Sequence, residues 1–291
     1  MKWHQVKEQA AGIKRLFLLY YIHKLFGRKT VKILIYFITL FAFFGAKNIR
    51  KCSEKYLSVV GIKPSLINQY RHFLEYSLSL LDRMEVFSGR FDNSRISFAD
   101  ENAKQELDAD YDKGIFFICS HLGNIDVMRS LLKDDPDKKI NVFLAKNQCK
   151  IFNDFIRAIS AKTTVTTYPV EDIGMDTSIE IKDKLTHGQI VVIAGDRTSK
   201  TSNNFKTKLF NRTVEMPLGA FKFAQLMETP VYFVCLIKSP DETYKIHLKK
   251  FIPDDNSEKT LAKMQKEYVE FLEEKTLSAP FQFFHFYDMF D

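Results

Sequence analysis

A histidine and an aspartate that stand five residues apart follow a short apolar run. His121 and Asp126 belong to the sequence SHLGNID, which comes directly after IFFIC at 115–119. If a helix begins about two residues after His121, the Asp126 carboxylate can accept a hydrogen bond from Nδ1 of the imidazole. Nε2 is then the basic nitrogen. The pair therefore predicts a general base that removes a proton from an attacking hydroxyl group.

The residues between His121 and Asp126 suit the same role. Gly123 permits a tight turn of the backbone, and Asn124 is expected to cap a helix at 123–133. The free N–H groups at the start of that helix favour a developing negative charge. A histidine that only hydrogen-bonds its neighbour is the alternative, because the H-x4-D spacing is common by chance.

A second polar cluster, at 195–199, follows the apolar run QIVVIA. It contains Asp196 and Arg197. The planar fork of an arginine suits an anionic head group or a phosphate, and a structural ion pair between the two residues is the alternative. Residues 205–212 then mix Phe and Leu with Lys and Arg, which predicts a loop that touches both lipid and head group.

Short apolar runs alternate with helical patterns after Gly114. Expected strands cover 115–119, 140–145, 163–168, 189–195, 230–238 and 244–252, and expected helices cover 65–83, 123–133, 150–160, 173–187, 217–228 and 261–277. This alternation predicts an α/β fold with a mixed, largely parallel sheet flanked by helices. Ligands of such sheets bind at the carboxyl ends of strands, where both polar clusters stand.

The N-terminal 51 residues differ from the rest of the chain in charge and hydropathy. They contain 11 Lys or Arg and one acid, a charge of +10, whereas the other residues contain 32 basic and 35 acidic side chains, a charge of −3. Positive charge confined to one end argues against a nucleic-acid binder. The uncharged run at 33–46 is shorter than the ~20 residues that a spanning helix needs.

We therefore expect residues 1–51 to form basic, aromatic helices in the interface of an anionic membrane. A short span and a helical hairpin that packs on a soluble domain are the alternatives. A cleavable signal peptide is not expected, because the small-residue cleavage site is missing. Residues 52–291 are expected to form the α/β domain.

The cysteines and serines indicate what chemistry to exclude. The four cysteines share no metal-ligand spacing, which predicts free thiols in a reducing compartment and no metal site; they are Cys52, Cys119, Cys149 and Cys235. A serine hydrolase is not expected either, because the chain has no G-x-S-x-G sequence.

The order of these blocks resembles the lysophospholipid acyltransferase superfamily, in particular its lipid A biosynthesis branch, the bacterial late acyltransferases. The similar blocks are KWHQVKEQAAGIKRLFLLYYIHKLFGR, ICSHLGNID, VVIAGDRTS, MPLGAFKFAQLMETPVYFVCLIK and APFQFFHFYDMF, which together cover nearly the whole chain. The resemblance implies a glycerolipid acyltransferase-like domain over 52–291. It also implies His121 as the general base and Asp126 as the acid that orients it.

The resemblance further implies where the substrates bind. The residues expected near the acceptor are Asn124, Lys146, Asn147, Asp196 and Arg197. The acyl donor would be an acyl carrier protein or acyl-CoA thioester, with no metal or bound cofactor. The expected location is the cytoplasmic face of the bacterial inner membrane, peripheral or with one short N-terminal span.

The expected function is transfer of a fatty acyl chain from the thioester to a hydroxyl or amine of a membrane lipid or glycolipid. The acceptor stays open between a lipid A-type molecule and a lysolipid. Two alternatives belong to other classes: a lipid hydrolase or thioesterase that uses the same histidine with water, and a non-catalytic membrane-binding protein of the same fold.

Overall fold

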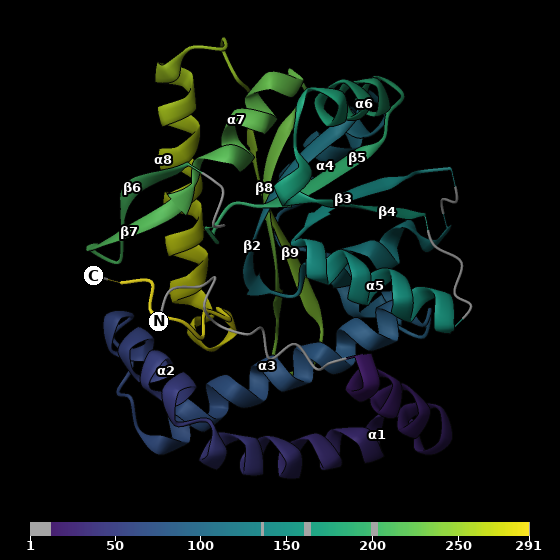
Figure 1. Ribbon diagram of the computed structural model, residues 1–291, viewed down its shortest axis with the longest axis vertical. Helices are drawn as coiled ribbons and strands as arrows, with labels where there is room; N and C mark the ends of the chain where they lie inside the picture. The colour runs from purple at the N-terminus through teal and green to yellow at the C-terminus, as the bar shows by residue number, and fades with distance from the viewer. Residues whose placement is uncertain (1–12, 135–136, 160–163, 199–202, 291) are drawn as a thin grey trace.

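A seven-stranded mixed sheet forms the centre of the computed structural model, which describes residues 13–134, 137–159, 164–198 and 203–290 (Figure 1). The strand order is β1-β9-β8-β2-β5-β3-β4, and β8 to β4 run parallel. β9 is antiparallel to β8 and parallel to β1. The strands are β1 (Ile96–Phe98), β2 (Ile115–Gly123), β3 (Ile140–Leu144), β4 (Val165–Pro169), β5 (Ile190–Ala194), β8 (Val231–Lys238) and β9 (Tyr244–Phe251). The predicted α/β class and the largely parallel sheet are confirmed.

Helices cover both faces of the sheet. They are α1 (Ile13–Gly45), α2 (Lys47–Val59), α3 (Leu66–Phe87), α4 (Glu101–Asp110), α5 (Lys146–Ala158), α6 (Met175–Thr186), α7 (Leu218–Met227) and α8 (Glu258–Ser278). Short 3₁₀ helices are η2 (Asn93–Arg95), η3 (Tyr111–Lys113), η4 (Ile125–Asp134), η5 (Val170–Asp172) and η6 (Pro280–Gln282). Side chains of β2 alternate between the layers: Phe116 and Ile118 join the core with α6, α7 and α8, whereas Phe117 joins the core with α4 and η4.

Serine caps define where two of the predicted helices begin. The Ser65 hydroxyl accepts a hydrogen bond from the Asn68 N–H at 3.2 Å, and the Ser257 hydroxyl accepts one from Thr260 at 3.2 Å. A hydroxyl in this position satisfies an N–H group that has no partner within the helix. These caps start α3 at Leu66 and α8 at Glu258, and α3 extends one turn beyond the predicted end at residue 83.

The segment expected to be a lipid-contacting loop is a hairpin instead. It consists of β6 (Asn204–Leu209) and β7 (Arg212–Pro217), joined at two residues with positive φ, as a tight hairpin turn requires. Alternation along β6 points Phe205 and Leu209 toward the core and the lysines between them toward solvent. The apolar residues of this segment are therefore part of the core, and the expected loop is wrong.

The N-terminal helices lie across the bottom of the domain in Figure 1, with α3 between α1 and the sheet. Val31 and Ile35 of α1 are buried against Leu78 and Leu81 of α3. Gly27 has a φ of 75° and a ψ of 174°, which bends α1. α2 runs from Lys47 to Val59, so the expected boundary after residue 51 falls within a helix.

An ionic cluster also attaches α1 to the rest of the chain. Arg28 donates to Asp82 at 2.7 Å and to Glu85 at 2.5 Å, both on α3. Arg28 and Lys32 each pair with Glu242 in the turn between β8 and β9. These two basic residues of the N-terminal segment are therefore neutralised within the fold.

Candidate active site

A bulge in β2 presents His121. Cys119 pairs with Val234 of β8 and Gly123 pairs with Leu236, so three residues on β2 lie opposite one on β8. Bulges of this kind redirect a side chain out of the regular pleat. Gly123 has a φ of 69°, and a Cβ there would come within 1.8 Å of the Leu236 carbonyl oxygen. The close approach of β8 therefore requires glycine at this position, and the bulge leaves the His121 side chain one-third exposed.

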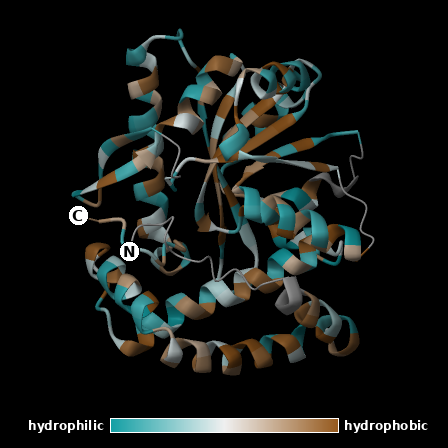
Figure 2. Ribbon diagram, in the orientation of Figure 1, coloured by the Kyte–Doolittle hydropathy of each residue, from teal (hydrophilic) through white to brown (hydrophobic). Residues whose placement is uncertain are grey.

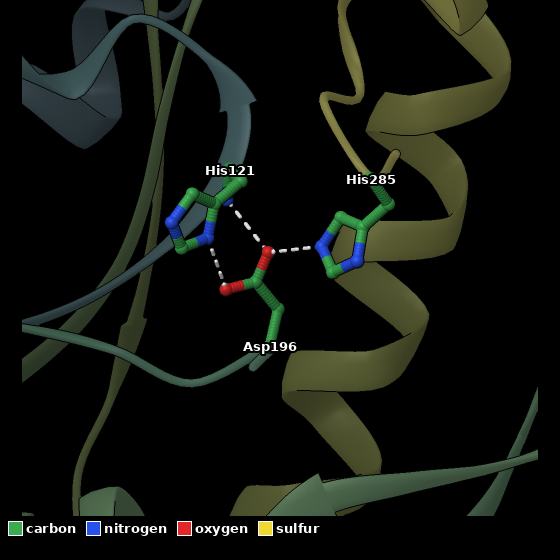
Figure 3. A group of neighbouring side chains, drawn as sticks. All are labelled: His121, Asp196 and His285. Carbon is green, nitrogen blue, oxygen red and sulfur yellow. Dashed lines mark hydrogen bonds and ion pairs between the residues drawn. The ribbon is translucent and has the colours of Figure 1, made fainter. Parts of the chain in front are cut away.

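Asp196 reaches His121 from the neighbouring strand. β5 pairs with β2 and ends at Ala194, opposite Cys119, and the Gly195 N–H donates to the Cys119 carbonyl at 2.9 Å. A Cβ at Gly195 would lie 2.8 Å from the Ile118 side chain, so glycine allows the loop to stay against β2. The buried Asp196 carboxylate then accepts hydrogen bonds from the His121 N–H at 2.6 Å and from its Nδ1 at 2.9 Å (Figure 3).

The charge state of Asp196 determines which nitrogen of His121 carries hydrogen. Burial raises the pKa of this carboxyl, but His121 and the hydrogen bonds from His121 and His285 outweigh burial and hold the pKa well below its usual range. An ionised carboxylate only accepts hydrogen bonds, so Nδ1 of His121 must be the donor. Nε2 is left as the basic nitrogen, on the side of the ring away from Asp196 (Figure 3).

A second histidine, His285, completes the cluster. Its Nε2 donates to the other carboxylate oxygen of Asp196 at 2.8 Å, and the ring is fully buried. The C-terminal segment 280–290 brings it there: Phe283 forms a bridge with Leu122, and the Phe284 N–H donates to the His121 carbonyl at 2.9 Å. The sequence predicts this segment as one of the similar blocks but indicates no role for its histidine.

Asp126 does not hold the position expected of it. Its carboxylate pairs with Nε of Arg83 on α3 at 2.5 Å, while Nδ1 of His121 is bonded to Asp196. The expectation assumed an α-helix that begins just after His121. In the structure β2 continues to Gly123 and the 3₁₀ helix η4 begins at Ile125, so the backbone carries the Asp126 side chain to α3.

Asn124 is a structural residue in this arrangement. It is 4% exposed, its side-chain amide donates to the Ser79 carbonyl of α3 at 2.9 Å, and its N–H donates to the Leu236 carbonyl at 2.9 Å. The residue therefore fastens the end of β2 to α3 and β8. Its contact with a substrate stays a prediction.

Lys146 and Asn147 lie at the same edge of the sheet but follow another strand. They begin α5 directly after β3, both are exposed, and Nζ of Lys146 is 3.6 Å from Asp172. β5 lies between β3 and β2, which separates two strands by about 10 Å. The structure thus places Lys146 and Asn147 beside the candidate site. Of the expected binding residues, Asp196 is the one whose side chain bonds to the His121 imidazole.

Arg197 turns toward the C-terminal segment. Its guanidinium donates to the Phe284 carbonyl at 2.7 Å. The neighbouring Asp196 is bonded to the two histidines, an arrangement that orients His121, and its role beside a head group stays a prediction. Ser199, the last residue of the expected cluster, lies outside the described residues.

Among the described residues, one group of three side chains could supply ligands to a metal ion. It consists of His121, Asp196 and His285, whose donor atoms lie within 4.8 Å of one another. Their contacts of 2.8–2.9 Å are hydrogen bonds. A tetrahedral zinc ion with bonds of ~2.0–2.1 Å needs its ligand atoms roughly 3.3 Å apart, so this arrangement suits proton transfer better than metal binding. The cysteines are free thiols, and all but the half-buried Cys52 are buried.

A surface cavity of about 450 Å³ lies far along the strands from His121. Lys113, Pro230 and Lys250 line it, which places it where β2 and β8 begin. His121 stands at the opposite end of β2, so this cavity is separate from the candidate site.

Comparison with known proteins adds no family assignment. No model of a known protein family matches the chain, and no curated protein is significantly similar to it in sequence.

Proposed function

We propose that this protein is an acyltransferase that moves a fatty acyl chain from an acyl thioester to a hydroxyl or amine of a membrane lipid, with His121 as the general base. The observation that carries the proposal is the 2.9 Å hydrogen bond between His121 Nδ1 and the buried Asp196 carboxylate. It directs the basic Nε2 of a partly exposed imidazole outward, at the end of a strand where α/β sheets bind ligands.

The proposed reaction needs one base and no covalent enzyme intermediate. Nε2 of His121 takes the proton from the acceptor hydroxyl while the oxygen attacks the thioester carbonyl carbon. The carbon–sulfur bond then breaks, and the imidazolium returns the proton to the leaving thiolate. The Asp196 carboxylate stabilises the transient positive charge on the ring. The products are an ester, or an amide for an amine acceptor, and a free thiol.

The resemblance of the blocks around His121 and Asp196 to bacterial late acyltransferases supports the choice of substrates. The donor is proposed to be an acyl carrier protein or acyl-CoA thioester, and the acceptor a lipid A-type molecule or a lysolipid at the cytoplasmic face of the inner membrane. A water molecule in place of the acceptor would make the same site a thioesterase, so product analysis decides between transfer and hydrolysis.

Replacing His121 by Gln is expected to lower acyl transfer by about 10²- to 10⁴-fold, because the amide keeps polarity but cannot serve as the base. Purified protein is incubated with labelled acyl thioester and an extract of bacterial lipids. Mass spectrometry then measures a lipid that has gained one acyl chain. His187→Gln is the matched control, because His187 is an exposed histidine at the end of α6.

Three outcomes of this assay are informative. Loss of the acylated lipid in His121→Gln but not in His187→Gln supports the proposal. Release of free fatty acid without an acylated lipid identifies a hydrolase instead. Equal acyl transfer by wild type and His121→Gln contradicts a catalytic role for the histidine, whereas absence of both products with either protein favours a membrane-binding protein of this fold.

The outer face of α1 supports membrane contact. Ile33, Phe37, Phe41 and Phe44 are spaced at four, four and three residues, so they form one stripe, and each is more than half exposed. Figure 2 shows α1 as a largely hydrophobic helix at the edge of the molecule. Among the described residues no single helix is long and apolar enough to cross a membrane, although Phe17–Gly45 and Lys47–Val59, bent by 96°, meet the criteria together.

Replacing both Phe37 and Phe41 by Asp is expected to weaken binding to anionic lipid vesicles by about 100-fold or more. Burial of each phenylalanine contributes about 1.5–3 kcal/mol. Vesicle co-sedimentation at several salt concentrations measures the affinity of each variant for the vesicles. The matched control is the double variant Met175→Asp and Ile179→Asp, which alters two exposed apolar residues of α6. Equal binding of both variants would contradict the α1 interface, and binding abolished by salt alone would indicate purely electrostatic attachment.

A further inference from the structure

We propose that His285 is a positioning residue of the active site, which holds the Asp196 carboxylate in the orientation that His121 requires. The inference rests on the proposed function and extends it to the C-terminal segment. Asp196 lies between two imidazole rings in Figure 3, with His121 bonded to one carboxylate oxygen through Nδ1 and His285 bonded to the other.

The contacts of the carboxylate explain why a second histidine is useful. Oδ2 of Asp196 accepts from the His121 N–H at 2.6 Å and from His285 Nε2 at 2.8 Å, whereas Oδ1 accepts from His121 Nδ1 at 2.9 Å. Two donors on Oδ2 fix the rotation of the carboxylate plane. Oδ1 is then directed at Nδ1 before any substrate binds, which is the kind of preorganisation on which rate depends.

The charge of His285 fits a donor that does not titrate during catalysis. Burial lowers the pKa of His285 to about 4, against the opposing effect of Asp196, so the ring is neutral near pH 7. A neutral imidazole that donates from Nε2 carries no hydrogen on Nδ1. Within the described part of the chain, Nδ1 of His285 has no hydrogen-bond partner.

The surroundings of His285 hold the ring rigidly. Its centroid lies 4.1 Å from that of Phe283 and 4.9 Å from that of Tyr287. The backbone is held as well, because His72 Nε2 donates to the Phe283 carbonyl at 3.0 Å and the Phe284 N–H donates to the His121 carbonyl at 2.9 Å. The C-terminal segment therefore supports the backbone of His121 and the side chain of Asp196 together.

The test compares two substitutions at His285. His285→Phe keeps a ring but removes the donor, and is expected to lower kcat by about 10- to 100-fold with little change in KM for the acyl thioester. His285→Gln places an amide N–H near the position of Nε2 and is expected to recover most of the lost kcat. Equal loss in both variants, or full kcat in a folded His285→Phe protein, would overturn the proposal.

His72→Phe is the matched control for burial. His72 is also fully buried and contacts the same segment, but its hydrogen bonds go to Ser53 and to the Phe283 carbonyl rather than to Asp196. The His72→Phe variant is expected to have a lower melting temperature but not the loss of kcat expected for His285→Phe. A loss of kcat equal to that of His285→Phe would mean that the whole segment acts only through folding, and would overturn a specific role for His285.

Nitrogen NMR of the imidazole rings in the wild-type protein tests the contact without substrate. We expect His285 to be neutral at pH 7 with hydrogen on Nε2. An imidazolium, or hydrogen on Nδ1, would overturn the proposal even if His285→Phe cannot be folded. This readout also separates the proposal from the proposed function, because it judges the bond between His285 and Asp196 whether or not the protein transfers acyl groups.

Discussion

We expect replacement of Asp196 by Asn to lower kcat for the proposed acyl transfer by about 10³- to 10⁴-fold, the size of the loss when a histidine base is left in the wrong tautomer. The carboxylate accepts from both the backbone N–H and Nδ1 of His121. An amide can accept with one atom only, and its NH₂ group then faces either the His121 N–H or Nδ1. With NH₂ toward Nδ1, hydrogen moves to Nε2 of His121 and the base is lost.

Asp126→Asn is the matched control for this prediction. Asp126 pairs with Arg83 in a contact that is 26% and 40% exposed on the two sides, and partly exposed ion pairs contribute about 1 kcal/mol or less. We therefore expect a loss of about fivefold or less. The measurement compares the steady-state kcat of the two variants, with circular dichroism used to show that equal fractions of each are folded. The reverse order of effects would show that Asp126 orients His121 during catalysis.

The strands of the sheet were predictable because parallel strands buried on both faces are continuous apolar runs. The runs at 115–119 and 190–194 locate β2 and β5 on this basis. The extension of β2 from Ser120 to Gly123 was not predictable, because it depends on partners that are distant in sequence. Leu236 of β8 and Phe283 of the C-terminal segment supply them.

The two chemical groups of the candidate site were predictable, but their pairing was not. His121 and Asp196 each follow an apolar run, which places both at the carboxyl edge of the sheet. The order in which strands neighbour one another cannot be read from one sequence, so the sequence alone favours the nearby Asp126 as the partner of His121. Adjacency of β2 and β5 is the physical reason that Asp196 is the partner instead.

His285 was missed because its segment has no periodic pattern. The run FQFFHFYDMF has Phe or Tyr at six of its ten positions, which indicates burial without indicating a direction. The buried carboxylate that selects the histidine lies 89 residues away. A polar residue inside a strongly aromatic segment was the available signal, since a buried imidazole requires a partner.

Charge counting at the N-terminus overestimated the positive charge that a membrane would meet. Arg28 and Lys32 belong to the basic segment, but their partners lie at least 54 residues later in the chain. Lys24 and Lys29 remain exposed on α1, and Lys29 stands four residues before Ile33, where the apolar stripe begins. Burial of phenylalanine side chains is therefore expected to contribute more to membrane contact than attraction between charges.

Replacing Asp82 by Ala is expected to lower the free energy of unfolding by about 3–5 kcal/mol, the usual consequence of removing one partner from a buried ionic cluster. Asp82 has no exposed side-chain surface and accepts from Arg28 at 2.7 Å, from Lys238 at 2.9 Å and from the Tyr244 hydroxyl at 2.7 Å. Its removal takes from Lys238 the carboxylate at 2.9 Å and from Arg28 one of three carboxylate partners. Urea unfolding at pH 7 measures the change.

The same substitution tests how strongly the ionic cluster on α3 holds α1 to the domain. Asp82 lies between Ser79, which holds Asn124, and Arg83, which holds Asp126, so one face of α3 contacts α1, β8 and the end of β2. Asp254→Ala is the matched control, because Asp254 is 70% exposed in its pair with Lys263 and should cost less than about 1 kcal/mol. Equal stability of the two variants would show that the buried cluster contributes no more than a surface ion pair, and that α1 is held to the domain by its apolar contacts with α3.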